Sequence, residues 1–210
     1  DLTLSNSQIV LKGAVKDANL AAIKIDGAAA NLSDVNIKAT SSTEGANSYN
    51  LVGIQAVNVA QIYGESINID LNTNHYAVSG AQEWHNFCEQ GIRLEGSTAQ
   101  ILESTIKGGA GVVLRTDSSF TMNGGAIDSI YYAVTGNNLT GKGNATLLGV
   151  TLTSEKTAAI YIPMQGEIVI GAGSVVQGPV AIEAKMGYFT ITDTTLISTA
   201  DAKEGLKYAE

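Results

Sequence analysis

Six side chains that could bind a partner or a metal ion lie within one stretch of the sequence, residues 68–90. They include the only tryptophan, the only cysteine and both histidines of the chain. Exposed aromatic side chains are frequent anchors in recognition surfaces. We therefore expect this stretch to be a candidate binding loop, and the alternative is that Trp84 and Phe87 fold back over the flank of the molecule. The residues are His75, Tyr76, Trp84, His85, Phe87 and Cys88.

The same stretch contains side chains of the types that bind zinc. Zinc prefers imidazole and thiolate ligands, and His85 and Cys88 are separated by two residues, with His75 nearby. This spacing supplies only half of a site, because no second paired motif accompanies it. We therefore expect no metal ligands and no cofactor-binding residues.

Two shorter motifs also resemble known sites. Gly141-Lys142-Gly143 lacks the spacing of a phosphate-binding loop and a following Ser or Thr, so a turn is expected there. The triplets that begin at Asn138 and Asn144 match the glycosylation sequon, but we interpret them as turn and strand polarity.

A repeated pattern shows which elements must position these side chains. The pattern is apolar-x-apolar-x-x-x-x-aliphatic, and Ala is accepted at its first position. Its last residues are 28, 30, 39, 21, 25, 23 and 21 positions apart, so the excess over the shortest interval is interpreted as loops. The copies are Leu2/Leu4/Ile9, Ala30/Leu32/Ile37, Ala60/Ile62/Ile67, Ala99/Ile101/Ile106, Phe120/Met122/Ile127, Ala145/Leu147/Leu152, Ile168/Ile170/Val175 and Phe189/Ile191/Leu196.

A second element alternates with the first and begins with Gly or Ala followed by an aliphatic residue. In a stack of coils about 4.8 Å apart, a larger first residue would crowd the copies above and below. The openings are Ala22-Ile23, Gly53-Ile54, Gly91-Ile92, Gly111-Val112, Ala133-Val134, Ala159-Ile160 and Ala181-Ile182.

Both elements alternate with a period of two, which indicates strands with one face inward. A single coil cannot bury its apolar face, whereas eight stacked coils form one continuous core. We therefore predict an all-β fold, a single-stranded right-handed parallel β-helix (β-solenoid) of about eight coils with loop insertions. It should span residues 1–199, with residues 200–210 as a polar tail or the start of a further coil.

Composition and charge exclude several classes of partner. The formal net charge is −8 and no Lys/Arg cluster occurs, which argues against nucleic acid and anionic membrane surfaces. No run of about 18 apolar residues is present, so no direct membrane insertion of this segment is expected. Cys88 is the only cysteine, so an intramolecular disulfide is excluded.

Parallel β-helices also include polysaccharide-cleaving enzymes, whose chemistry needs two nearby carboxylates. In the expected stack, such a pair would lie at matching outward positions of adjacent coils. No acidic pair occurs in the column from Lys24 to Glu183 or in the column from Asp26 to Lys185, where Glu95 and Arg115 should face each other. The column after the last aliphatic residue, with Asn68 between Lys38 and Lys107, is mixed. We therefore expect no catalytic residues.

Residues 103–114 (ESTIKGGAGVVL), 120–125 (FTMNGG) and 190–196 (TITDTTL) resemble the coils of pertactin-like autotransporter passenger domains. The resemblance implies display on the bacterial cell surface and anchoring to the outer membrane through a C-terminal β-barrel of the parent chain, which is missing here. It also implies a role in adhesion, aggregation or host interaction, with a host surface protein or glycan, or a second copy, as partner. The alternative is a carbohydrate-binding or carbohydrate-cleaving β-helix, similar to lyases or phage tailspikes.

Overall fold

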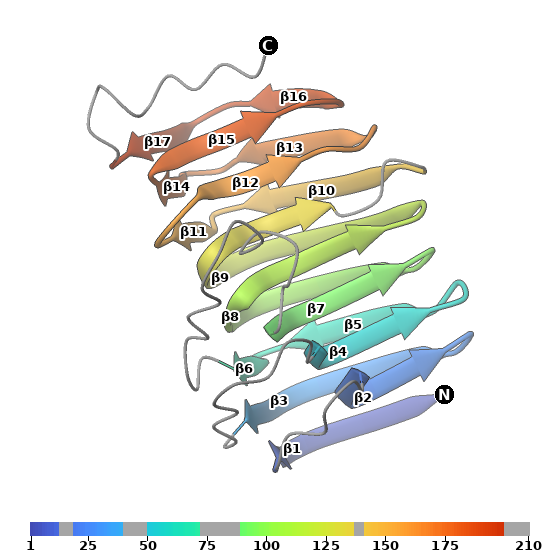
Figure 1. Ribbon diagram of the computed structural model, residues 1–210. Coiled ribbons are helices and arrows are strands. Elements are labelled where there is room, and N and C mark those ends of the chain that lie inside the picture. Colours follow the sequence, from blue (N-terminus) through green and yellow to red (C-terminus); the bar gives the residue numbers. More distant parts are fainter. Residues whose placement is uncertain (13–18, 40–49, 72–88, 137–140, 200–210) are drawn as a thin grey trace.

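The computed structural model describes residues 1–12, 19–39, 50–71, 89–136 and 141–199, and this part of the chain is all β with no helix. The strands run across the long axis of the molecule, with the first strand near one end and the last strand near the other (Figure 1). The strands are β1 (Leu2–Leu11), β2 (Asn19–Asp26), β3 (Ala29–Ala39), β4 (Asn50–Val57), β5 (Gln61–Glu65), β6 (Asn68–Asp70), β7 (Glu89–Glu95), β8 (Thr98–Arg115), β9 (Ser118–Gly136), β10 (Gly143–Leu148), β11 (Thr151–Ser154), β12 (Ala158–Ile162), β13 (Glu167–Gly171), β14 (Ser174–Gly178), β15 (Val180–Ala184), β16 (Tyr188–Ile191) and β17 (Thr194–Ser198).

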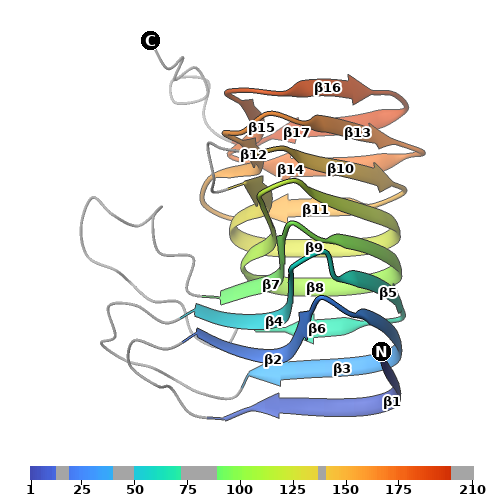
Figure 2. The ribbon, with the colours of Figure 1, turned by 90° about the vertical axis from the view of Figure 1, so that its right-hand side faces the viewer.

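The strand pairings are parallel and form three rows, which we call A, B and C. Row A contains β1, β3, β5, β8, β9, β10, β13 and β16. Row B contains the later parts of β1, β3, β8 and β9 together with β6, β11, β14 and β17. Row C contains β2, β4, β7, the ends of β8 and β9, β12 and β15. One passage through A, B and C is a coil, and successive coils lie one above another in both views (Figures 1 and 2).

Row C confirms the predicted stacking of the Gly/Ala-aliphatic openings. Ile92 pairs with Val112, and the aliphatic residues of all seven openings pair in succession from β2 to β15. Most of these side chains, including Ile54 and Val134, are fully buried in one continuous core. The large parallel sheet and this core are what a β-solenoid requires.

Rows A and B confirm six of the eight predicted triplets, including the pairing of Ile106 with Ile127. One prediction is wrong by two residues. The coil expected to contribute Ala60, Ile62 and Ile67 instead places Ile62 against Ala99 and aligns Gly64 with Ile101.

The physical reason for this correction is the space around Gly64. A side-chain carbon on Gly64 would overlap Ile67 and lie 2.8 Å from Ile101 Cδ1. Ile67 therefore fills the place that an aliphatic residue occupies in other coils. Because a glycine stands at this inward position, Ile62 and Gly64 do not match the apolar pattern. Ala60 and Ile62, two residues earlier, do match it, and the prediction was therefore placed there.

A repeated corner separates row A from row B. The residue at this corner has a positive φ, which is uncommon outside glycine. In the coil of β13 and β14 this corner has one extra residue, and both Ala172 and Gly173 have a positive φ, so Val176 takes the place predicted for Val175 and pairs with Leu152 and Leu196. In β9, Gly124 and Gly125 also both have a positive φ, but no residue is added there. The corner residues are Asn6, Asp34, Ser66, Glu103, Gly124, Gly149, Ala172, Gly173 and Asp193.

The small residues that open row C face a different neighbour from the one expected. A side-chain carbon on Gly111 would overlap Ile127 Cγ2 from row B and lie 2.6 Å from the carbonyl oxygen of Ala133. Gly91 has the equivalent contacts with Ile106 and Gly111. The opening is therefore small because the row B isoleucine of the next coil, and not only the row C backbone of that coil, occupies the space.

Replacing Gly111 with Ala should lower the free energy of unfolding by about 1–3 kcal/mol, because the added methyl group overpacks a closed core. Urea denaturation measures this change. Gly171→Ala is the control, because its added carbon meets nothing closer than Thr192 Oγ1 at 3.1 Å. Equal losses in the two variants would contradict the proposed crowding.

Candidate functional site

The predicted binding loop lies outside the described residues. This applies to His75, Tyr76, Trp84, His85 and Phe87, and its role stays a prediction. Cys88, and with it the half zinc site, lies outside them too.

A groove of about 320 Å³ crosses five coils on the outer face of row A. Its walls are outward side chains in two columns, because strand residues alternate between the core and the surface. The first column is Thr3, Asn31, Tyr63, Gln100 and Thr121. The second column is Ser5, Ser33, Glu65, Leu102 and Asn123.

The chemistry of the groove suits a neutral polar ligand with apolar faces. Tyr63 lies at the centre of the groove and is 46% exposed. Asn31 and Gln100 flank it from the adjacent coils, and amide groups both donate and accept hydrogen bonds. Glu65 is the one carboxylate among the groove residues. Sequence reasoning missed Tyr63, because the predicted register placed it beside Ser33 and Leu102, whereas the structure places it between the amides of Asn31 and Gln100.

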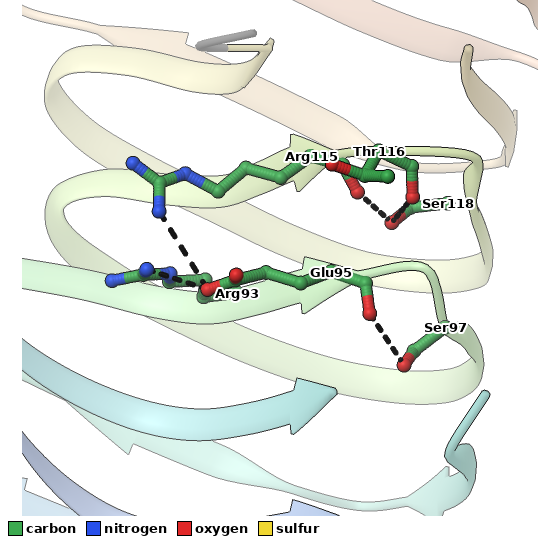
Figure 3. Close-up of polar contacts among 6 residues, drawn as sticks. All are labelled: Arg93, Glu95, Ser97, Arg115, Thr116 and Ser118. Atoms are coloured by element: carbon green, nitrogen blue, oxygen red, sulfur yellow. Dashed lines mark hydrogen bonds and ion pairs between the residues drawn. The ribbon is translucent and has the colours of Figure 1, made fainter. Parts of the chain in front are cut away.

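A second polar cluster lies on row C, where two arginines hold one carboxylate (Figure 3). Glu95 Oε1 lies 2.5 Å from Arg93 Nη2 and 3.6 Å from Arg115 Nη1. Arg93 is buried, whereas Glu95 and Arg115 are half-buried. Burial, followed by the positive charge of Arg93, lowers the pKa of Arg115. The predicted pairing of Glu95 with Arg115 is confirmed, and Arg93 is an additional partner that sequence reasoning missed.

Serine hydroxyls hold the turns that follow this cluster. Ser97 Oγ donates to the carbonyl oxygen of Glu95 at 3.0 Å and accepts from the amide of Ala60 at 3.2 Å. Ser118 Oγ donates to the carbonyl oxygen of Arg115 in the next coil (Figure 3). These hydrogen bonds therefore fix the backbone at the ends of β7 and β8, where Glu95 and Arg115 lie.

Glu95→Gln should lower the free energy of unfolding by about 1–3 kcal/mol, because it leaves two adjacent guanidinium groups without their anion. Arg115→Gln should cost less, below about 1 kcal/mol, because Arg93 still neutralises Glu95. Denaturant titration at low salt measures both. A larger loss for Arg115→Gln would contradict this assignment.

Glu89, at the start of β7, is a buried carboxyl group that is 4% exposed. Burial raises its pKa from 4.5 to about 7. Its Oε2 atom packs beside Gly109, 3.5 Å from the point where a side-chain carbon of that residue would sit. The folded state therefore favours the neutral acid.

This shift predicts a pH-dependent stability. Below pH 4.5 the folded and unfolded states both hold the proton, and as pH rises towards about 7 only the unfolded state loses it, so stability falls. Glu89→Gln should match the natural chain near pH 4 and exceed it above pH 7 by up to about 3 kcal/mol. Urea denaturation across this range tests it, and an unchanged difference between the two chains at all pH values would contradict it.

Aromatic side chains cover a further part of row C. The rings of Tyr132 and Tyr161 stack with centroids 5.1 Å apart, and Lys185 Nζ lies 5.2 Å from the Tyr161 ring centre. Burial, with a smaller effect of the Glu183 charge, raises the pKa of Tyr132 to about 12. These tyrosines pack with Val113 and other apolar side chains as a small outer cluster, so their role is structural.

The outward column of row B differs from the predicted one. Asp70, and not Asn68, lies between Lys38 and Lys107. This follows from the two-residue shift at Gly64. Charges therefore alternate along the column, and the next residue, Asp128, lies 3.6 Å from Lys107 Nζ.

Comparison with known families, curated proteins and solved structures gives no match. Within the described ranges, no group of three or more His, Cys, Asp or Glu side chains could hold a metal ion. None of the described residues forms a helix long and apolar enough to cross a membrane.

Proposed function

We propose that residues 1–199 form one right-handed parallel β-helix. Three rows of parallel strands joined in coil order support it, since crossover connections between parallel strands are right-handed in about 98% of cases. The in-register aliphatic core of rows A, B and C supports a continuous stack.

This β-helix acts as a non-enzymatic, surface-displayed segment of a pertactin-like autotransporter passenger. It serves adhesion, aggregation or host interaction at the bacterial cell surface. The observation that carries the proposal is the groove on row A, which presents Tyr63 among hydroxyl and amide side chains across five coils. Tyr is an effective contact residue because it combines a broad apolar ring with a hydroxyl group.

The charge environment of row C agrees with a binding role. A carboxylate that cleaves glycosidic bonds must be free to contact the substrate. Glu95 is instead engaged by the guanidinium groups of Arg93 and Arg115. This cluster therefore stabilises the stack of coils and serves no proton transfer.

Tyr63→Ala should reduce the attachment of protein-coated beads to host epithelial cells by about tenfold, the loss expected for one aromatic anchor. Tyr188→Ala is the matched control, because Tyr188 is 82% exposed and lies outside the groove. Attachment counted under flow measures the effect. Equal attachment of Tyr63→Ala and the natural chain would contradict the role of the groove.

A carbohydrate-binding or carbohydrate-cleaving β-helix is the second candidate. The same groove favours it, because aromatic rings, amides and hydroxyl groups match the faces and hydroxyls of sugars. Incubation with a panel of polysaccharides, followed by measurement of new reducing ends, separates the two. Polysaccharide cleavage that is lost in the Glu65→Gln variant would contradict the non-enzymatic proposal and support the second candidate.

A further inference from the structure

The groove on row A runs along the long axis of the molecule, across its strands. Its two columns of outward side chains are separated by the inward positions of the same strands. Leu32, Gly64 and Ile101 stand at these inward positions, so their backbone forms the floor of the groove. Coils about 4.8 Å apart give the groove a length of about 20 Å. This shape fits an extended chain molecule better than a compact one.

The floor offers no backbone groups with which a peptide strand could pair. β5 pairs in parallel with β3 on one side and with β8 on the other, so its backbone hydrogen bonds are used within the stack. A peptide that joins a sheet as an added strand needs a free edge. A ligand in the middle of this groove is therefore recognised through side chains.

The side chains at the centre of the groove match the hydroxyl groups and C–H faces of a sugar. Tyr63 offers an exposed apolar ring with a hydroxyl at its tip. Asn31 and Gln100 flank it from coils that are about 10 Å apart, too far for these two amides to bond each other. In row B, by contrast, the amides of Asn36 and Asn68 in adjacent coils bond at 3.1 Å. Sugar hydroxyls donate and accept hydrogen bonds, as amides do.

The charge of the groove selects against acidic ligands. Among the described residues that line it, Glu65 is the only charged one. Arg and Lys are the side chains that bind carboxylate and phosphate groups most strongly, and an acidic glycan would meet Glu65 without either of them. Leu102 pairs with Glu65 in the next coil and is 41% exposed, so it adds apolar surface instead of a positive charge.

We infer, on the basis of the proposed binding role of this groove, that its ligand is an uncharged linear glycan that lies along the long axis of the molecule. One sugar ring stacks on Tyr63, and the adjacent sugars bond to Asn31 and Gln100. Glu65 is the specificity residue that rejects acidic glycans. Glycoside cleavage needs two carboxylates, so with Glu65 alone the glycan is bound without being cleaved.

Neutral linear hexasaccharides test the chemical class of the ligand. In isothermal titration calorimetry, at least one of cellohexaose, maltohexaose and chitohexaose should bind the natural chain. Tyr63→Ala should weaken this binding by about tenfold, because the stacking surface is lost. Tyr188→Ala is the control, since Tyr188 is exposed outside the groove and should leave the affinity unchanged.

An acidic chain of the same length tests the role of Glu65. Hexagalacturonate should bind the natural chain severalfold more weakly than the neutral hexasaccharide does. Glu65→Lys should strengthen the binding of hexagalacturonate severalfold, because a positive charge then faces its carboxylates. Glu65→Gln should give an intermediate affinity.

The orientation of the glycan is tested by amides on and off the groove. Asn31→Ala and Gln100→Ala should each weaken the neutral hexasaccharide severalfold, because a chain along the axis reaches both coils. Gln61→Ala is the matched control, since Gln61 is an exposed amide of β5 itself that lies outside the groove. A glycan that followed β5 would give the opposite pattern.

The inference would be overturned if no neutral hexasaccharide bound the folded natural chain, or if hexagalacturonate bound as tightly as the neutral chains. It would also be overturned if Gln61→Ala weakened binding and the two groove amides did not. Cell attachment separates this inference from the proposed function. Attachment that depends on Tyr63 without any binding of neutral hexasaccharides would keep the adhesive role and reject the glycan, whereas absence of both would reject both.

Discussion

The parallel, in-register stacking of inward aliphatic side chains is the interaction on which the rest of this structure depends. No coil has a core of its own, so an inward residue such as Ile92 is buried only because Ile54 and Val112 pair with it on either side. Stability in such a stack is approximately a sum of contacts between neighbouring coils. A register error in one coil would therefore weaken the packing of both neighbouring coils.

The same stacking turns single outward residues into columns with a shared chemistry. On row A it brings hydroxyl and amide side chains of five coils around Tyr63. On row C it brings Arg115 to the carboxylate that Arg93 of the preceding coil already holds. Surface chemistry in this molecule is thus arranged across coils about 4.8 Å apart as well as within single strands.

Coils tolerate irregularities as long as the inward columns survive. Gly64 removes one apolar side chain, and Ile67 fills the space from a neighbouring position of its own coil. The extra residue at Ala172 and Gly173 is absorbed at the corner, after which Val176 returns to the column of Leu152. The backbone of this corner still bonds to the adjacent coils, because Gly173 N donates to the carbonyl oxygen of Asp193 at 2.8 Å and Gly149 N donates to that of Gly171 at 3.1 Å.

The amino-acid sequence by itself determined the strand character, the Gly/Ala-aliphatic register of row C and six of the eight triplets, because alternation with a period of two reflects burial directly. It also placed Glu95 opposite Arg115. Only the tertiary structure decided the register at Ile62 and Gly64, the ion pair between Arg93 and Glu95, and the groove around Tyr63. These features depend on which side chain fills a shared space between coils, and a linear pattern of apolar residues contains no information about that space.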